Sequence, residues 1–197
     1  MPWLEPVTLR GAHARLEPLS QAHRDGLVEA VQDGELWKLW YTSVPKPEDM
    51  AKEIDRRLGL QTAGAMLPFT VFDADDRIAG MSTYMNVDVG NRRVEIGSTW
   101  YARRVQRTPL NTQCKLLLLA HAFEQRDCIA VEFRTHFFNH QSRRAIERLG
   151  AKQDGILRSH QIAPNGTLRD TVVYSIIASE WPTVKTHLTY QLNDKPR

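Results

Sequence analysis

The order of apolar and polar residues along the chain predicts alternating helices and strands. Two short extended pieces around Gly11 precede Ser20, a residue type that caps helices, and a helix over residues 21–33 is expected to follow. Pro47 opens a second helix, which runs to Gly64 with apolar residues at about helical spacing. The aromatic stretch "ELWKLWYTSVP" is expected to be an irregular connection between these two helices.

The middle of the chain predicts three strands. The segments "LPFTVFD" (67–73) and "IAGMSTYMNVDV" (78–89) are expected to form a hairpin across the turn "ADDR". A third strand is expected over residues 92–102. Gly97 lies in the middle of that strand, which indicates either a bulge or a close approach of another group to the backbone.

The second half of the chain predicts several further elements. They are a helix over residues 109–126, a strand over 129–137, a helix over 139–149, a hairpin over 151–177 and a short helix opened by Ser179 and Pro182. Asn165–Gly166 fits the tight turn of the hairpin. Strands mixed with crossover helices predict an α/β fold whose sheet is antiparallel in part and parallel in part. At 197 residues without a linker, the chain is expected to form one domain, residues 1–197.

Composition narrows the classes of protein that need to be considered. Hydrophobic residues make up 42% of the chain and charged residues 25%, which is typical of a globular protein, and no apolar run has membrane-spanning length. The first residues, "MPWLEPVTLR", lack the layout of a signal peptide, so a cytoplasmic protein is expected. Cys114 and Cys128 form no metal-binding pattern, and His136 and His140 lack a third ligand in pattern, so no metal site is expected.

The positive charge of the chain is concentrated in two segments. Residues 92–107 contain five arginines and one glutamate, and residues 134–148 contain four arginines and one glutamate, whereas the whole chain carries a net charge of only +3. Two compact basic segments suit a small anion better than a long nucleic-acid track. A solvated arginine-rich surface is the alternative interpretation.

One of these segments leads directly into a helix, in the stretch "RVQRTPLNTQCKLLLLAHAF" (104–123). The first amides of a helix are unpaired and carry the positive end of its dipole, so they attract phosphate. Pro109 has no amide, and Arg104 and Arg107 could add charge-assisted contacts. The amides offered here belong to Thr108, Leu110, Asn111 and Thr112. The alternative is an ordinary helix start capped by Thr108.

The residues of this region resemble the acetyl-CoA-binding core of the GCN5-related N-acetyltransferase (GNAT) superfamily. That family carries Q/R-x-x-G-x-G/A at the start of the helix; here Gln106 matches the first position, whereas Pro109 and Asn111 replace the glycines. Glu95 lies eleven residues before Gln106, as a strand glutamate does in some members. The downstream segment "NHQSRRAIERLGA" resembles the family's N-x-x-S-x-x-x-x-E-x-x-G segment through Asn139, Ser142, Glu147 and Gly150. The similarity covers most of the chain and is closest to the branch that acetylates protein N-terminal amines, including those of ribosomal proteins.

The resemblance implies a GNAT fold: a mixed, mostly antiparallel central sheet flanked by helices, with a splayed strand pair that holds acetyl-CoA. It also implies a set of residues that bind acetyl-CoA or coenzyme A. These are Trp100, Tyr101, Ala102, Arg103, Arg104, Gln106, Arg107, Thr108, Pro109, Leu110, Asn111, Thr112, Asn139, Ser142 and Arg143.

Two residues are candidates for catalysis. Glu95 could take the proton of the attacking amine, or it could be a strand carboxylate paired with Arg92 or Arg93. Ser142 could protonate the departing thiolate, because Ile146 occupies the position at which many members have a tyrosine; a water could do the same. Asn139 could bind the pantetheine amide, cap its helix, or do both.

The acceptor is expected near the early aromatic residues, although half-buried packing is the more ordinary role of such side chains. The substrate-binding candidates are Trp37, Trp40, Tyr41, Tyr84 and Asn86. The resemblance implies transfer of an acetyl group to a primary amine, either a protein N-terminus or a small amine, by direct attack in a ternary complex. It implies no nucleic-acid or membrane partner and allows a homodimer. A catalytically silent coenzyme A sensor and a basic nucleic-acid-binding module are the alternatives.

Overall fold

The computed structural model describes residues 3–193, and its strands form one eight-stranded sheet in the order β1-β2-β3-β4-β5-β6-β8-β7. The strands are β1 (Leu9–Arg10), β2 (Ala14–Pro18), β3 (Met66–Asp73), β4 (Ile78–Asp88), β5 (Arg93–Tyr101), β6 (Ala130–His136), β7 (Lys152–Ile162) and β8 (Leu168–Ile177). Neighbouring strands are antiparallel except β5 and β6, which are parallel. The predicted mixed, mostly antiparallel sheet is confirmed.

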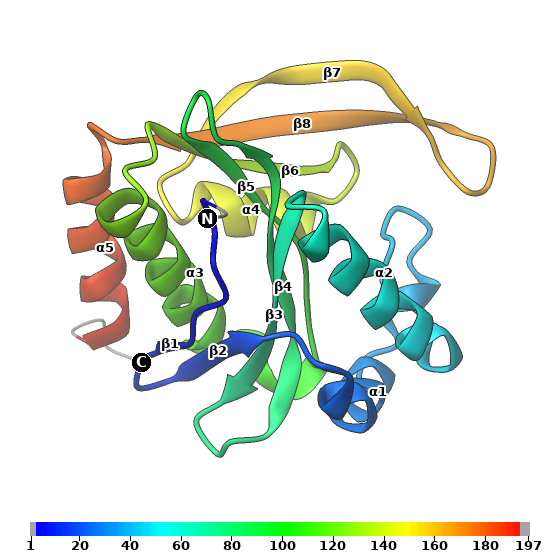
Figure 1. Cartoon of the computed structure of the whole chain (residues 1–197). Coiled ribbons are helices and arrows are strands. Elements are labelled where there is room, and N and C mark those ends of the chain that lie inside the picture. The colour runs from blue at the N-terminus through cyan, green and yellow to red at the C-terminus, as the bar shows by residue number, and fades with distance from the viewer. Residues whose placement is uncertain (1–2, 194–197) are drawn as a thin grey trace.

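Helices cover both faces of this sheet (Figure 1). They are α1 (Arg24–Gln32), α2 (Met50–Thr62), α3 (Leu110–Ala120), α4 (His140–Glu147) and α5 (Trp181–Asn193). Alternation along β4 explains which helix meets which face. Tyr84 donates a hydrogen bond to the carbonyl of Leu118 in α3, whereas Thr83 accepts one from Arg57 in α2. Helices α2 and α3 therefore lie on opposite faces.

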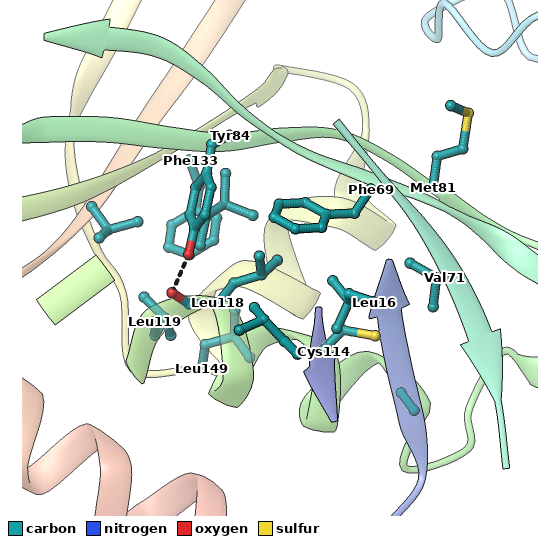
Figure 2. Packing of buried hydrophobic residues seen from close by; sticks show 14 of the residues in the cluster. Leu16, Phe69, Val71, Met81, Tyr84, Cys114, Leu118, Leu119, Phe133 and Leu149 are labelled. Atoms are coloured by element: carbon teal, nitrogen blue, oxygen red, sulfur yellow. Dashed lines mark hydrogen bonds between the residues drawn. The ribbon is translucent and has the colours of Figure 1, made fainter. Parts of the chain in front are cut away.

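The largest part of the core lies between the sheet and α3 (Figure 2). Phe69, Phe133 and Leu118 are among the fully buried side chains there, and the long apolar run of α3 supplies much of this surface. Each such side chain contributes about 1.5–3 kcal/mol when it leaves water, so the position of α3 on the sheet is set by many contacts.

The predicted elements agree with the structure, with differences at their ends. The helix expected over residues 109–126 is α3 followed by a π-helical turn at His121–Gln125. The hairpin turn is also confirmed, because Gly166 has φ +82°, a conformation that glycine adopts without strain. None of the helices described between residues 3 and 193 is long and apolar enough to cross a membrane.

Candidate active site

The sheet opens where β5 and β6 separate. The two parallel strands pair only from Arg93–Ala130 to Glu95–Glu132, although β5 continues to Tyr101 and β6 to His136. Beyond Glu95 the backbone edge of β5 that faces β6 is not paired with it. The splayed strand pair expected from the resemblance is therefore present.

Two irregularities in the β4–β5 ladder shape this opening. The register shifts between Met81 and Thr83, where Ser98 has φ +46°, and again after Met85, where Asn86 has φ +48°. A Cβ atom on Gly97 would lie 2.6 Å from Glu95 Oε1, so the glycine leaves room for that carboxylate. The bulge and the close approach predicted at Gly97 are both observed.

Glu95 is the buried carboxylate at the point of separation. Its side chain is 5% exposed, and Asn86 Nδ2 donates a hydrogen bond to its Oε2 at 2.7 Å. Arg134 Nε lies 3.6 Å from the same oxygen, so the expected alternative partners, Arg92 and Arg93, are not the ones that contact it. Burial raises the pKa of Glu95 to about 6, against the opposing effects of Asn86 and Arg134. A carboxylate with such a pKa is ionised at neutral pH and still accepts a proton readily.

The turn before α3 presents main-chain donors. Arg107 has φ +62°, Thr108 Oγ1 accepts a hydrogen bond from the amide of Leu110, and Pro109 is helical at φ −62°. The N-cap is Pro109, so Thr108 lies one residue before the position expected for it, although its hydroxyl holds the Leu110 amide. The amides of Asn111 and Thr112, on the first turn, have no acceptor among the described residues. These donors, with the helix dipole behind them, fit a diphosphate.

At the end of β5, which precedes this turn, one residue has its main-chain groups on the side that faces away from β4. The amide of Ala102 donates to the carbonyl of Ala79 in β4 at 2.8 Å, so Ala102 turns its main chain toward β4. Because pairing alternates along an antiparallel ladder, Tyr101 turns its amide and carbonyl away from β4. Gln106 Nε2 donates to the Tyr101 carbonyl at 3.1 Å. Among residues 100–102, Tyr101 therefore has its main chain on the open side.

Two of the arginines expected to bind the cofactor have other partners. Arg104 forms an ion pair with Asp73 and donates to the Ile78 carbonyl at 2.9 Å. Asp73 is 9% exposed, so this pair fastens β3 to the loop after β5. With these partners, the Arg104 side chain is not left free for the cofactor as the resemblance implied. Arg107 differs, because it is exposed and forms no ion pair with any residue between 3 and 193.

The start of α4 is arranged partly as expected. Asn139 is its N-cap, with Oδ1 accepting a hydrogen bond from the Ser142 amide at 3.0 Å. The Ser142 side chain is partly buried in the first turn. Arg143 was expected at the cofactor, but its Nε donates to the Tyr174 hydroxyl at 3.1 Å and its guanidinium lies 5.1 Å from the Phe137 ring centroid. These contacts hold Arg143 against the sheet rather than leaving its guanidinium free for the cofactor.

Aromatic side chains gather at the far end of β6. The Trp40 ring centroid lies 5.0 Å from that of His136, 5.6 Å from that of Tyr41 and 6.1 Å from that of Phe138. Trp40 is 51% exposed, whereas His136 is 4% exposed. We call these four residues the aromatic cluster. Trp37 lies apart from it and packs partly buried against the core.

Comparison with known proteins identifies the family. A family model described as an acetyltransferase (GNAT) domain matches residues 13–152. The chain belongs to the GNAT acetyltransferases. A crystal structure of a GCN5-related N-acetyltransferase from Brucella melitensis is 30% identical, with 98% of this chain and 88% of that chain covered and a TM-score of 0.86.

Two further matches are to proteins with names of their own. The "Putative ribosomal N-acetyltransferase YdaF" of Bacillus subtilis is 32% identical over 107 residues, and the match spans 54% of this chain and 57% of that protein, less than two thirds of its length. The RimJ structure from Mycobacterium smegmatis, solved with CoA-disulfide, shares the fold at 20% identity and a TM-score of 0.79, over 94% of this chain and 93% of that one.

Within this GNAT site, two of the acceptor candidates have different positions from those expected. Tyr84 is fully buried, and its hydroxyl contacts Leu118 and His121 in the core (Figure 2). It was wrongly assigned to the acceptor, because alternation along β4 directs it to the face opposite Glu95. Asn86 instead contacts Glu95 itself.

Sequence reasoning did not predict a role here for three residues on the Glu95 face: Arg134, His136 and Arg169. It had considered His136 only as a possible metal ligand. Alternation along "EFRTH" could have placed Glu132, Arg134 and His136 on one face, but the pairing of β6 with β8 that brings Arg169 there is a long-range contact. Among the described residues, no three His, Cys, Asp or Glu side chains gather as metal ligands would.

Proposed function

We propose that this GNAT enzyme transfers an acetyl group from acetyl-CoA to a primary amine by direct attack in a ternary complex. The observation that carries the proposal is Glu95, a buried carboxylate with a raised pKa at the point where β5 and β6 separate. A base at this position can deprotonate an amine that lies in the opening.

The residues that would hold acetyl-CoA are mostly main-chain donors. The amides of Asn111 and Thr112 would meet the diphosphate, with the exposed Arg107 beside them, and the Tyr101 backbone would pair with the pantetheine arm. Asn139 already caps α4 through its side chain, so any contact with the pantetheine is in addition to that role. Bound acetyl-CoA supplies an acetyl group as a thioester, whose carbonyl carbon accepts the amine nitrogen.

The chain's own groups handle the protons. An alkylammonium must lose a proton before its nitrogen can attack, and Glu95 takes that proton directly or through a water. Asn86 and Arg134 hold the carboxylate in place through its Oε2. When the carbon–sulfur bond breaks, the thiolate needs a proton, and Ser142 or a water supplies it. Ile146, at the position where many family members have a tyrosine, is apolar and has no proton to give.

The acceptor is a protein N-terminus or a small amine. The description of YdaF, "Putative ribosomal N-acetyltransferase", favours a protein N-terminus, and so does the length of the face between Glu95 and the aromatic cluster. Trp40 and Tyr41 would contact the acceptor at the far end of that face.

Thiol release from acetyl-CoA tests the proposal. Short peptides with free N-termini, their N-acetylated counterparts, polyamines and aminoglycosides form the panel of acceptors. We expect turnover with at least one free amine, none with the blocked peptides, and a rate that rises with pH through about 6 as Glu95 ionises. Tight coenzyme A binding without turnover on any acceptor would support the silent sensor instead.

A further inference from the structure

The sheet face that carries Glu95 continues as a row of polar side chains toward the aromatic cluster. Glu132, Arg134 and His136 alternate along β6 on this face, and His136 lies opposite Thr171 of β8. His136 is four residues from Glu132, the cross-strand neighbour of Glu95. At about 3.3 Å per residue, this row is about 13 Å long.

The charges along the row are not balanced. Arg134 Nε lies 2.5 Å from Glu132 Oε1 and 3.6 Å from Glu95 Oε2, and Arg93 lies 3.5 Å from Glu132. Both glutamates therefore have guanidinium partners without the help of any other cation.

Arg169 is the remaining cation on this face. It is partly buried, its Nε donates to Thr171 Oγ1 at 3.1 Å, and no carboxylate within the described residues lies at ion-pair distance from it. Burial lowers the pKa of Arg169, and the charge of Glu95 opposes this. Because Thr171 lies opposite His136, the hydrogen bond to Thr171 directs the Arg169 side chain back along the row toward His136.

His136 adds a neutral donor. Its Nδ1 accepts a hydrogen bond from the Phe138 amide at 3.1 Å, so the neutral ring carries its proton on Nε2. Nε2 is buried and has no partner among residues 3–193. Burial lowers the pKa of His136 and the Arg169 charge lowers it further, while Asp170 raises it.

The ring of Trp40 packs against the ring of His136, with 5.0 Å between the ring centroids. The two rings stand at 80° to each other, and Trp40 belongs to a connection without regular secondary structure over residues 39–46. For an oxygen to reach the buried His136 Nε2, the half-exposed Trp40 side chain would have to turn aside.

We propose that Arg169 and His136 bind a carboxylate of the acceptor, so that the preferred acceptor is a primary amine that also carries an acidic group. This inference rests on the proposed function. With the amine at Glu95, an extended peptide of about 3.3–3.6 Å per residue reaches the end of the row within four residues. Peptides with Asp or Glu at the second to fourth position fit this spacing, whereas a polyamine would bring further positive charge to Arg169.

Peptide binding tests the proposal without requiring turnover. Three pairs of peptides carry Glu or Gln at position two, three or four, and each is titrated calorimetrically into the protein with coenzyme A present. We expect at least one Glu peptide to bind about ten- to a hundredfold more tightly than its Gln partner, as charge-assisted hydrogen bonds do. In Arg169→Ala this ratio should fall to about one, whereas Arg169→Lys should keep part of it.

Arg24→Ala is the matched control, because it removes one positive charge from an exposed arginine of α1 whose one ion-pair partner within residues 3–193 is Asp25. Its Glu-to-Gln ratio should equal that of the wild type. Circular dichroism verifies the fold of each variant, and Arg169→Gln replaces Arg169→Ala if the latter does not fold.

Equal binding of every Glu and Gln pair by the wild type overturns the proposal, as does a preference that persists in the Arg169 variants. The same peptides are then assayed for acetylation. Preferential binding without acetylation would leave the carboxylate site standing and count against the proposed function alone.

Discussion

The two halves of the site use different chemistry. On the cofactor side, residues 107–112 offer main-chain amides at a helix start, and the side chains of the neighbouring Arg104 and Gln106 serve structural contacts. On the proposed acceptor side, the candidate groups are side chains: a buried carboxylate, Glu95, and the cations around it.

This difference explains why the turn keeps main-chain donors although the family's glycines are missing. An amide belongs to every residue except proline, so Asn111 and Thr112 provide donors whatever their side chains are. Arg107 accepts φ +62°, a conformation that glycine would adopt with less strain. Titratable side chains have no such substitutes, so the acceptor side should be much more sensitive to single replacements.

The largest expected effect is on catalysis. We expect Glu95→Gln to lower turnover by about 10²- to 10⁴-fold, the range of general base catalysis, and to leave coenzyme A affinity unchanged in calorimetry. The variant should also lose the rise in rate through about pH 6. Glu132→Gln, one strand away, is the control and should retain that rise. An undiminished rate in Glu95→Gln would remove its role as the base.

Lys115 is a buried lysine of α3, the helix whose start lies on the cofactor side. Replacing it tests how a buried charge affects the stability of this part of the fold. Lys115 Nζ donates to Thr99 Oγ1 in β5 at 3.1 Å, and burial lowers the pKa of Lys115 to about 8 from its ordinary 10.5. The charge of Lys115 therefore destabilises the folded state below pH 8, and this cost fades as the pH rises from 8 to 10.5.

We expect Lys115→Met to raise the free energy of unfolding by up to about 3 kcal/mol at pH 7 and by little near pH 11, measured by urea denaturation. Thr99 and Ser82 remain hydrogen-bonded to each other at 2.8 Å, so the replacement strands neither hydroxyl. If Lys115→Met lowered the free energy of unfolding equally at pH 7 and near pH 11, Lys115 would contribute to stability through packing alone.

Glu95→Gln should change the pH dependence of stability in addition to lowering activity. The pKa of Glu95 is raised from 4.5 to about 6, so the folded state binds this proton more tightly than the unfolded chain does. Wild-type stability therefore falls as the pH rises from 4.5 to 6. Denaturant titrations give the difference in the free energy of unfolding between Glu95→Gln and the wild type. From pH 4 to pH values above 6, this difference should shift by about 2 kcal/mol in favour of the variant. A difference that does not change with pH would contradict the raised pKa.

The smallest effect compares two neighbouring arginines of equal charge. Arg107→Ala should weaken coenzyme A binding by about five- to tenfold, or about 1 kcal/mol, because it removes one exposed charge beside the helix start. Arg104→Ala should leave this affinity unchanged and lower the free energy of unfolding by about 1–2 kcal/mol, because it leaves Asp73 without its partner. Equal losses of affinity in calorimetry would contradict the division between the two residues.

Much of the fold followed from local signals. Pro47, Asn139 and Asn165–Gly166 mark boundaries that the structure confirms within a few residues, because caps and turns depend on a few neighbouring backbone angles. Side-chain partners were predicted less well. Arg104, Arg143 and Tyr84 all found partners distant in sequence, which no local pattern records.

By itself, the sequence determined the element order, the helix start that follows Gln106 and the place of Glu95 eleven residues before it, since these depend on spacing along one stretch of chain. Only the tertiary structure decided which arginines remain unpaired and which carboxylate is buried. Those outcomes depend on the pairing of β6 with β5 and β8, and the electrostatic energy of a charge depends on the neighbours and the solvent that this pairing leaves around it.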